Sequence, residues 1–164
     1  MAIFSNLPSE DGQEPVATIN GMNHVGISVS SLERSIAFYR DMLGLELAGP
    51  IVPFEGPLFE QVMALKSPKG RIGFMTNGRV QLELFEFERP RPAAMNPDYP
   101  VADHGISHFG IDVVGIDSIY ERLSAAGVRF HCPVLTFPGG VRATYARDID
   151  GNVFELLERP ASRQ

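Results

Sequence analysis

Two histidines and two glutamates recur at matching points of the sequence. His24 opens the stretch "HVGISV", and His108 opens "HFGIDV" 84 residues later. Glu83 in "VQLELFEF" and Glu155 in "NVFELLE" each stand among apolar residues. A buried carboxylate is strongly disfavoured unless it is paired or coordinated. Two imidazoles with two carboxylates form a ligand set that suits a divalent metal ion.

Strand alternation explains how these side chains would share a surface. Successive side chains of a strand point to opposite faces, so Val25 and Ile27 face one way while His24 and Gly26 face the other. The same split places His108 opposite the apolar residues of the second copy. A single strand histidine is more often structural, but the repetition favours a site to which each half contributes one His and one Glu.

The elements that must position these residues also repeat. Each half reads as an alternating strand, an amphipathic helix ended by a glycine (Gly44 or Gly127), and three further strands. Ser30 and Glu33 have the spacing of a capping box at the start of the first helix. The sequence therefore predicts an α+β protein of two tandem βαβββ modules. The expected divisions are an N-terminal tail (1–20), a first module (21–90), a Pro-rich linker (91–103) and a second module (104–160), with 21–160 forming one domain.

Composition excludes several classes of partner. The 14 Lys and Arg against 20 Asp and Glu give a net charge of −6, which argues against nucleic-acid binding. No apolar run approaches the roughly 20 residues that span a bilayer, so no membrane partner is expected. The N-terminus lacks the pattern of a secretory signal, and Cys132 has no second cysteine to pair with. We therefore expect a cytoplasmic protein.

The motifs "NHVGISVSSLERSIAFYRDMLGLEL", "GISHFGIDV" and "DIDGNVFELLE" resemble the vicinal oxygen chelate superfamily, which includes glyoxalase I, methylmalonyl-CoA epimerase, extradiol dioxygenases and the bleomycin- and fosfomycin-resistance proteins. The resemblance covers about residues 21–160. It implies paired βαβββ modules whose mixed sheets form a cupped, partly open barrel around a metal. It assigns the metal to His24, Glu83, His108 and Glu155. Ile149 stands where the family usually has proline in its "DPDG" turn.

The resemblance leaves several reactions open. Glyoxalase I is similar in having an acid where Glu83 stands, but its glutathione-binding positions correspond to Ser28 and Phe87 here. No basic cluster suits the phosphate tail of CoA, as the epimerase would need. Extradiol dioxygenases resemble the subset His24, His108 and Glu155, a triad suited to Fe(II). Fosfomycin-resistance enzymes share the triad but usually carry more basic residues, and bleomycin-binding proteins have lost the ligands.

We expect a metal-dependent lyase or isomerase of the glyoxalase I type, which chelates a small vicinal-oxygen substrate and moves a proton through an enolate. Alternatives are an Fe(II)-dependent extradiol ring-cleaving dioxygenase and a ligand-sequestering protein without turnover. The cofactor would be one divalent ion (Zn, Ni, Co, Mn or Fe(II)), and the assembly a homodimer. The expected catalytic residues are Glu83, Glu155 and Tyr145, and the expected substrate-binding residues are Phe85, Phe87, Arg142 and His104.

Overall fold

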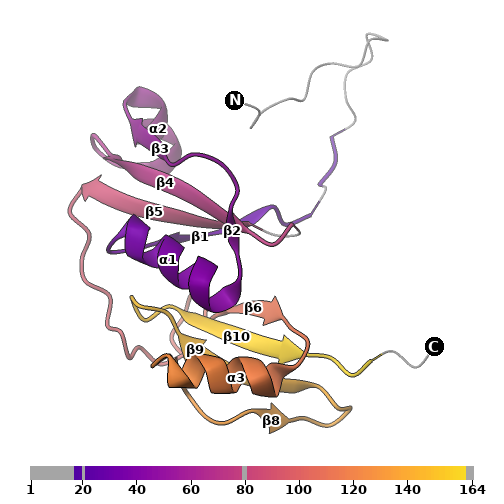
Figure 1. Cartoon of the computed structure of the whole chain (residues 1–164). Helices are drawn as coiled ribbons and strands as arrows, with labels where there is room; N and C mark the ends of the chain where they lie inside the picture. The colour runs from indigo at the N-terminus through magenta and orange to yellow at the C-terminus, as the bar shows by residue number, and fades with distance from the viewer. Residues whose placement is uncertain (1–16, 20, 79–80, 162–164) are drawn as a thin grey trace.

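A computed structural model describes residues 17–19, 21–78 and 81–161 (Figure 1). The first group of elements is β1 (His24–Ser28), α1 (Leu32–Leu43), β2 (Glu46–Leu47), β3 (Val52–Glu55), α2 (Pro57–Met63), β4 (Lys69–Thr76) and β5 (Gln81–Arg89). The second group is β6 (Phe109–Asp112), α3 (Ile116–Ala125), β7 (Arg129–Phe130), β8 (Leu135–Thr136), β9 (Arg142–Arg147) and β10 (Val153–Glu158). The predicted N-terminal tail lies almost entirely outside the described residues.

The two groups form two mixed sheets of the same topology. The first has the order β1-β5-β4-β2 with β3 also paired to β4, and the second has β6-β10-β9-β7 with β8 paired to β9. In each sheet the first strand runs parallel to the last, and the other pairs are antiparallel. The predicted α+β class and repeated modules are confirmed, whereas the exact domain boundaries stay a prediction.

Each sheet has one short strand more than the sequence predicted. β3 contains Pro53, and β8 has two residues, so neither shows the alternation that marks a strand in sequence. Both add to an outer part of the sheet, next to β4 or β9. The strands that carry the candidate site residues are therefore unaffected.

Helix α1 begins and ends on local signals. The N-cap is Ser31, whose hydroxyl accepts from the Arg34 backbone N–H at 3.4 Å, so the cap lies one residue after the predicted Ser30. Gly44 ends the helix with φ 69°, a left-handed conformation that favours glycine, as predicted. The Ser30 backbone N–H instead donates to Asp150 Oδ2 of the second module at 3.0 Å.

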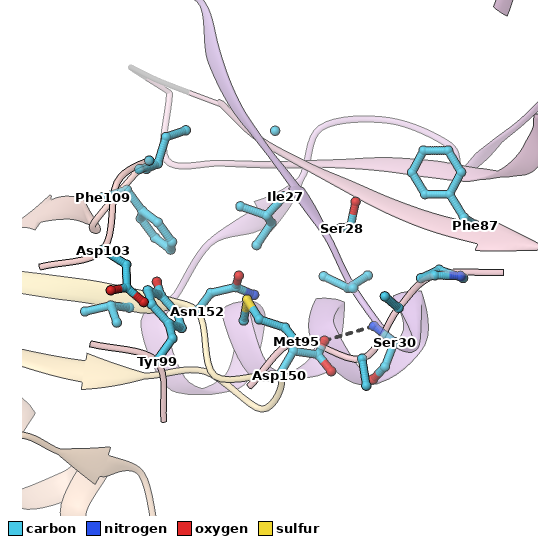
Figure 2. Close-up of a pocket in the computed structure, with 18 of the residues that line it drawn as sticks. Ile27, Ser28, Ser30, Phe87, Met95, Tyr99, Asp103, Phe109, Asp150 and Asn152 are labelled. Carbon is cyan, nitrogen blue, oxygen red and sulfur yellow. Dashed lines mark hydrogen bonds between the residues drawn. The ribbon is translucent and has the colours of Figure 1, made fainter. Parts of the chain in front are cut away.

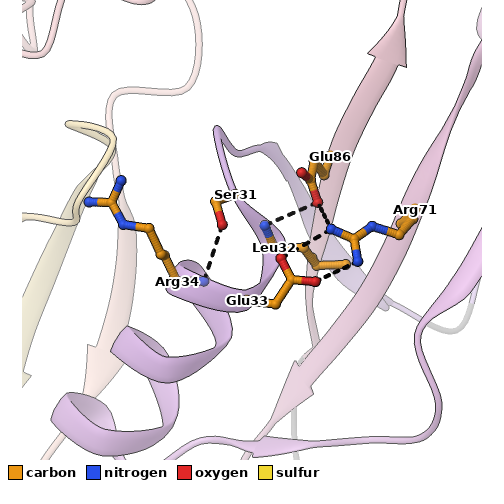
Figure 3. A network of polar contacts seen from close by, with 6 residues as sticks. All are labelled: Ser31, Leu32, Glu33, Arg34, Arg71 and Glu86. Carbon is orange, nitrogen blue, oxygen red and sulfur yellow. Dashed lines mark hydrogen bonds and ion pairs between the residues drawn. The ribbon is translucent and has the colours of Figure 1, made fainter.

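An arginine and two acids fasten α1 and α3 to their sheets. In the first module, the Arg71 guanidinium binds both Glu33 of α1 and Glu86 of β5, and Glu86 Oε2 accepts from the Leu32 N–H at 3.3 Å (Figure 3). This places a carboxylate at the N-terminus of α1, where the helix dipole stabilises it.

The second module repeats that network with equivalent residues. Arg142 of β9 donates to both oxygens of Asp117 in α3 at 2.8 and 2.6 Å, and to Glu158 Oε2 of β10 at 3.3 Å. Glu158 Oε1 accepts from the Gly115 N–H and, at 3.3 Å, from the Ile116 N–H. Arg142 is thus the structural counterpart of Arg71.

Two apolar cores meet at α1. Phe38 and Leu43 pack against both cores, and Phe38 approaches Phe154 of β10 with ring centroids 6.1 Å apart. The buried Tyr39 hydroxyl donates to Asp148 Oδ2, in the turn between β9 and β10, at 2.6 Å. These contacts fix one module against the other. Among the described helices, none is long and apolar enough to cross a membrane.

Candidate metal-binding site

The first module brings His24 and Glu83 together across a parallel strand pair. Gly26 of β1 is in register with Glu83 of β5, and His24 Nε2 lies 3.2 Å from Glu83 Oε2. The Asn23 side-chain oxygen is 2.9 Å from His24 Nδ1; because an amide oxygen only accepts, this contact requires a proton on Nδ1. Nε2 is then the nitrogen available to a metal or a proton.

The environment of Glu83 is only partly solvated. Its side chain is 13% exposed, against 43% for His24. Burial raises the pKa of the Glu83 carboxyl, and the nearby His24 opposes that rise in pKa. Such a carboxylate gains from a cation beside it, which a divalent ion would supply.

The second module repeats this arrangement. Gly110 of β6 is in register with Glu155 of β10, and His108 Nε2 lies 3.5 Å from Glu155 Oε2. Ser107 Oγ is 2.9 Å from His108 Nδ1, so this histidine also has a polar neighbour on its outer nitrogen. Each module therefore carries one imidazole and one carboxylate, oriented toward each other.

Glycines leave room beside each carboxylate. A Cβ at Gly26 would lie 3.4 Å from Glu83 Oε2, and a Cβ at Gly110 would lie 3.5 Å from Glu155 Oε2. Any side chain longer than a methyl group at either position would therefore crowd the carboxylate.

The structure does not bring the two His–Glu pairs into one four-ligand set. Within residues 17–19, 21–78 and 81–161, no group of three or more His, Cys, Asp or Glu side chains is close enough to hold a metal ion. Each pair on its own offers one nitrogen and one oxygen ligand, half of the set that a protein metal site commonly uses. The nitrogen and oxygen ligands fit a divalent metal, and each module carries two of the four ligands.

Tyr145 lies beside the second His–Glu pair. Its hydroxyl is 3.3 Å from His108 Nε2, and the two rings have centroids 4.5 Å apart. Tyr145 is also in register with Glu155 on the neighbouring strand. Burial, and then the charge of Glu155, raise the pKa of the Tyr145 hydroxyl.

Arg142 is not brought to this group. It lies three residues before Tyr145 on β9, so the two side chains point to opposite faces. Its guanidinium is held by Asp117 and Glu158 on the side of α3. Sequence reasoning missed this role; the structure shows it by register, because Arg71 is paired with Glu86 and Arg142 with Glu158.

Aromatic rings line the face of the first sheet that carries Glu83. Phe85 and Phe87 follow Glu83 at alternate positions of β5 and stack with centroids 5.7 Å apart. Phe54 of β3 is fully buried and meets Phe87 at 5.2 Å. The result is a continuous apolar wall near the first His–Glu pair.

A cavity of about 800 Å³ lies between the first strands of the two modules and the linker (Figure 2). Phe87 and Ser28 from the first module line it together with His104 and His108 from the second. Linker residues that sequence reasoning did not single out, among them Tyr99, form another wall. The volume is in the range of small-molecule sites.

Comparisons with known proteins agree with this architecture. The family model described as the Glyoxalase/Bleomycin resistance protein/Dioxygenase superfamily matches residues 21–156. The mitochondrial methylmalonyl-CoA epimerase of Bos taurus is 28% identical over 132 residues, which are 76% of this chain and 65% of the epimerase, so the match spans just under two thirds of that relative.

Solved structures share the fold. A glyoxalase family protein from Bacillus cereus superposes with a TM-score of 0.79 at 28% identity, covering 89% of this chain and 98% of that protein. Lactoylglutathione lyase from Agrobacterium tumefaciens superposes with a TM-score of 0.57 at 23% identity, over 87% and 96% of the two chains. The chain belongs to the glyoxalase/bleomycin resistance protein/dioxygenase superfamily.

Proposed function

We propose that this chain is a divalent-metal-dependent enzyme that binds a small substrate through two neighbouring oxygens and catalyses a lyase or isomerase reaction by proton transfer. The observation that carries the proposal is the repeated His–Glu pair, with Nε2–Oε2 distances of 3.2 and 3.5 Å in the two modules. The metal ligands would be His24, Glu83, His108 and Glu155. The bound metal would act as a Lewis acid that stabilises an enolate.

The chain's own residues would supply the proton transfers. Glu83 is the better candidate base, because burial raises the pKa of its carboxyl toward the range in which a carboxylate can take a substrate proton. Glu155 stands at the equivalent place and would serve the opposite face of the substrate. Tyr145, within 3.3 Å of His108, would donate a hydrogen bond to a substrate oxygen.

The wall of Phe85 and Phe87 favours a substrate with an apolar or aromatic body. His104, which lines the cavity together with His108, would contact its polar end. The Bos taurus relative is an epimerase by name, which accords with proton transfer as the reaction class.

We further propose that a second copy of the chain completes each metal site. Inside one chain, α1 holds the modules together through the Phe38–Phe154 contact and the buried Tyr39–Asp148 hydrogen bond. Bringing the two His–Glu pairs together within one chain would break these contacts between the modules. The loss would cost several kcal/mol, of which the hydrogen bond to Asp148 alone accounts for roughly 1.5–3 kcal/mol. A site formed between the first module of one copy and the second module of another leaves all of these contacts intact.

Metal content and subunit complementation test the proposal together. Purified protein should hold one divalent ion per chain, and His24→Ala or His108→Ala should lose both metal and activity. When these two variants are mixed and allowed to exchange subunits, half of the dimers should carry one intact site. Activity should then return to about a quarter of the wild-type value.

A mixture of His24→Ala with Glu83→Ala is the matched control, because both changes lie in the first module and no exchange can restore a site. Full metal retention in His108→Ala would overturn the metal site. Loss of metal without any restoration in the first mixture would keep the site and overturn only its division between copies.

The Fe(II)-dependent ring-cleaving dioxygenase remains a second candidate, favoured by the Phe85–Phe87 wall and by Tyr145 beside His108. Oxygen uptake with a catechol, dependent on Fe(II), would establish it. Turnover with a redox-inert ion such as Zn²⁺ would exclude it. Metal-independent ligand binding without turnover would instead indicate a sequestering protein.

A further inference from the structure

His131 extends the second half of the candidate metal site by one strand. Glu155 of β10 is in register with Tyr145 of β9, and the His131 backbone N–H, just after β7, donates to the Tyr145 carbonyl at 2.8 Å. Residues directly opposite each other in neighbouring strands carry their side chains on the same face of the sheet. Glu155, Tyr145 and His131 therefore form one row across three strands, which we call the polar row. It lies on the sheet face that carries His108, two residues before the register partner of Glu155.

The side chains of the polar row contact each other and the candidate metal ligand. The rings of His131 and Tyr145 have centroids 6.0 Å apart and planes at 63°. The Tyr145 hydroxyl lies 3.3 Å from His108 Nε2. His131 is exposed and Tyr145 is half-buried, so a ligand held at the second His–Glu pair can reach both rings.

The equivalent row of the first module is apolar beyond its acid. Phe74 of β4 is in register with Glu83, and the Ala48 backbone N–H, just after β2, donates to the Phe74 carbonyl at 2.8 Å. Strands β4 and β2 correspond to β9 and β7, so Phe74 stands where the second module has Tyr145. By the same correspondence, Ala48 stands in the place of His131. The candidate ligand histidine of the first module meets Phe74 edge-on, with ring centroids 6.3 Å apart.

This difference makes the two halves of the site chemically unequal. Both modules supply one imidazole and one carboxylate, but the second adds a phenol and a further imidazole in the row of its acid. Beside Glu83, the first module instead presents the stacked rings of Phe85 and Phe87. A substrate at the joined site would therefore turn a polar group toward the polar row and its apolar body toward these phenylalanines.

Two arginines stand beside the polar row on the same face of the sheet. Arg147 and Arg129 are in register with each other, and each lies two residues from a member of the row, Tyr145 or His131. Arg129 forms an ion pair with Asp98 at 2.6 Å. Arg147 is 8% exposed and donates to two backbone carbonyls, at 2.7 and 2.9 Å, so within the described part of the chain its charge has no ion-pair partner.

The charges of these arginines act on His131. Desolvation is the largest cause that lowers the pKa of His131, and the charges of Arg147 and Arg129 follow. The imidazole is thus mostly neutral at neutral pH, where it carries one N–H donor. The positive potential that disfavours a protonated imidazole favours an anionic group at the same place.

We propose that the substrate carries a carboxylate that binds to Tyr145 and His131, and that His131 determines this specificity. The inference rests on the proposed function, because the metal would hold the two chelating oxygens beside Glu155 and neutralise the charge of that acid. The Tyr145 hydroxyl and the imidazole N–H would each donate a hydrogen bond to the carboxylate. Neighbouring strands are about 4.8 Å apart, so the polar row extends about 10 Å from Glu155, which accommodates a single ring that carries the carboxylate.

Calorimetry on the full chain loaded with Zn²⁺ tests the inference. The probes are catechol, 3,4-dihydroxybenzoate and 3,4-dihydroxybenzamide, which share the same pair of neighbouring oxygens. The benzoate and the benzamide have nearly the same shape and differ in charge. We expect the benzoate to bind at least about tenfold more tightly than the benzamide. Catechol, which lacks the carboxylate, reports on chelation by the metal alone.

Replacing His131 by alanine gives the second module the side chain that Ala48 provides in the first. His131→Ala should reduce the preference for the benzoate to within about threefold, because it removes one hydrogen-bond donor and keeps the Tyr145 hydroxyl. The His131 side chain is exposed, and its backbone hydrogen bond does not involve the imidazole. The fold should therefore persist in this variant, as circular dichroism would verify.

Arg129→Gln tests the electrostatic part of the inference, and Arg122→Gln is its matched control. Both replacements remove an exposed cation of the second module. Arg122, however, belongs to α3, which packs on the opposite face of the sheet. Arg129→Gln should lower the preference for the benzoate, whereas Arg122→Gln should keep it.

The outcomes separate this inference from the proposed function. If catechol binds but the benzoate is no tighter than the benzamide, or if His131→Ala keeps the wild-type preference, the carboxylate site is wrong and the metal site stands. If the protein takes up no Zn²⁺, or if none of the three probes binds to the loaded protein, the proposed function and this inference are both overturned.

Discussion

The Tyr39 hydroxyl donates a 2.6 Å hydrogen bond to Asp148 Oδ2 and thereby links two modules that the chain joins only through its linker. The two residues are 0% and 4% exposed, so the bond is shielded from water. It fixes the end of β9 against α1, and so determines how the His108 half of the site is oriented relative to the His24 half.

Replacing Tyr39 by phenylalanine removes this bond and preserves the packing of the ring. Asp148 would keep its three other donors, so we expect the free energy of unfolding to fall by about 1.5–2 kcal/mol, at the low end of the range for a hydrogen bond to a charged group. Urea denaturation gives the difference. Tyr120→Phe is the control, because the described residues offer the Tyr120 hydroxyl no partner, and an equal loss in both variants would contradict the assignment.

The same tyrosine predicts a dependence of stability on alkaline pH. Burial raises the pKa of Tyr39 well above its ordinary value, and Asp148 raises it further. A pKa that is higher in the folded state gives stability that is complete below the unfolded pKa of about 10 and declines as pH rises above it.

The advantage of the wild type over Tyr39→Phe should therefore be constant up to about pH 9 and then shrink, by at most about 1.4 kcal/mol per pH unit. Urea midpoints of both proteins from about pH 8 to about pH 11 provide the test. If the stability difference between the two proteins stays constant over this range, the pKa of Tyr39 is the same in the folded and unfolded states, which would contradict the prediction.

Gly70 of β4 cannot accept a side chain. A Cβ there would lie 2.1 Å from the Glu86 carbonyl oxygen and 2.7 Å from the ring of Phe54. We expect Gly70→Ala to lower the free energy of unfolding by about 3 kcal/mol or more, since backbone must move to admit the methyl group. Gly73→Ala in the same strand is the comparison, because its Cβ would meet atoms no closer than 3.5 Å and should cost less than about 1 kcal/mol.

The two acids of the candidate site should contribute similarly to metal affinity. Even groups outside the ligand shell contribute about 10- to 100-fold, so Glu83→Gln and Glu155→Gln should each weaken binding by at least that much. Competition with a chromogenic chelator measures the change. Glu88→Gln, on the same strand as Glu83 but paired with Lys69 on the surface, should bind metal normally. Unchanged affinity in Glu83→Gln alone would assign Glu83 to catalysis without ligation.

Much of the fold and of each half-site could be predicted from sequence because the signals are local and repeated. The alternation that places His24 opposite Val25, and the 84-residue offset to His108, need no tertiary information. The strand pairing that brings each histidine to the acid of its own module was not predicted, and the structure supplies it through the Gly26–Glu83 and Gly110–Glu155 registers.

The surroundings of the site depend on contacts that periodicity does not encode. Arg142 has the residue type expected for a substrate anchor, yet its face and its acidic partners show that it fastens α3. Contacts between residues about a hundred positions apart, such as Tyr39 with Asp148, are set by the packing of one module on the other.

The parallel pairing of first and last strand in each module has a consequence during synthesis. His24 leaves the ribosome early, but β1 cannot join its sheet until β5 and Glu83 have followed. The first half can then close as a unit, with its imidazole and carboxylate already in place, before His108 has left the ribosome. A ribosome stalled far enough beyond the linker for β5 to have left the exit tunnel should expose a nascent chain whose first sheet resists protease, whereas one stalled with β5 still inside the tunnel should not.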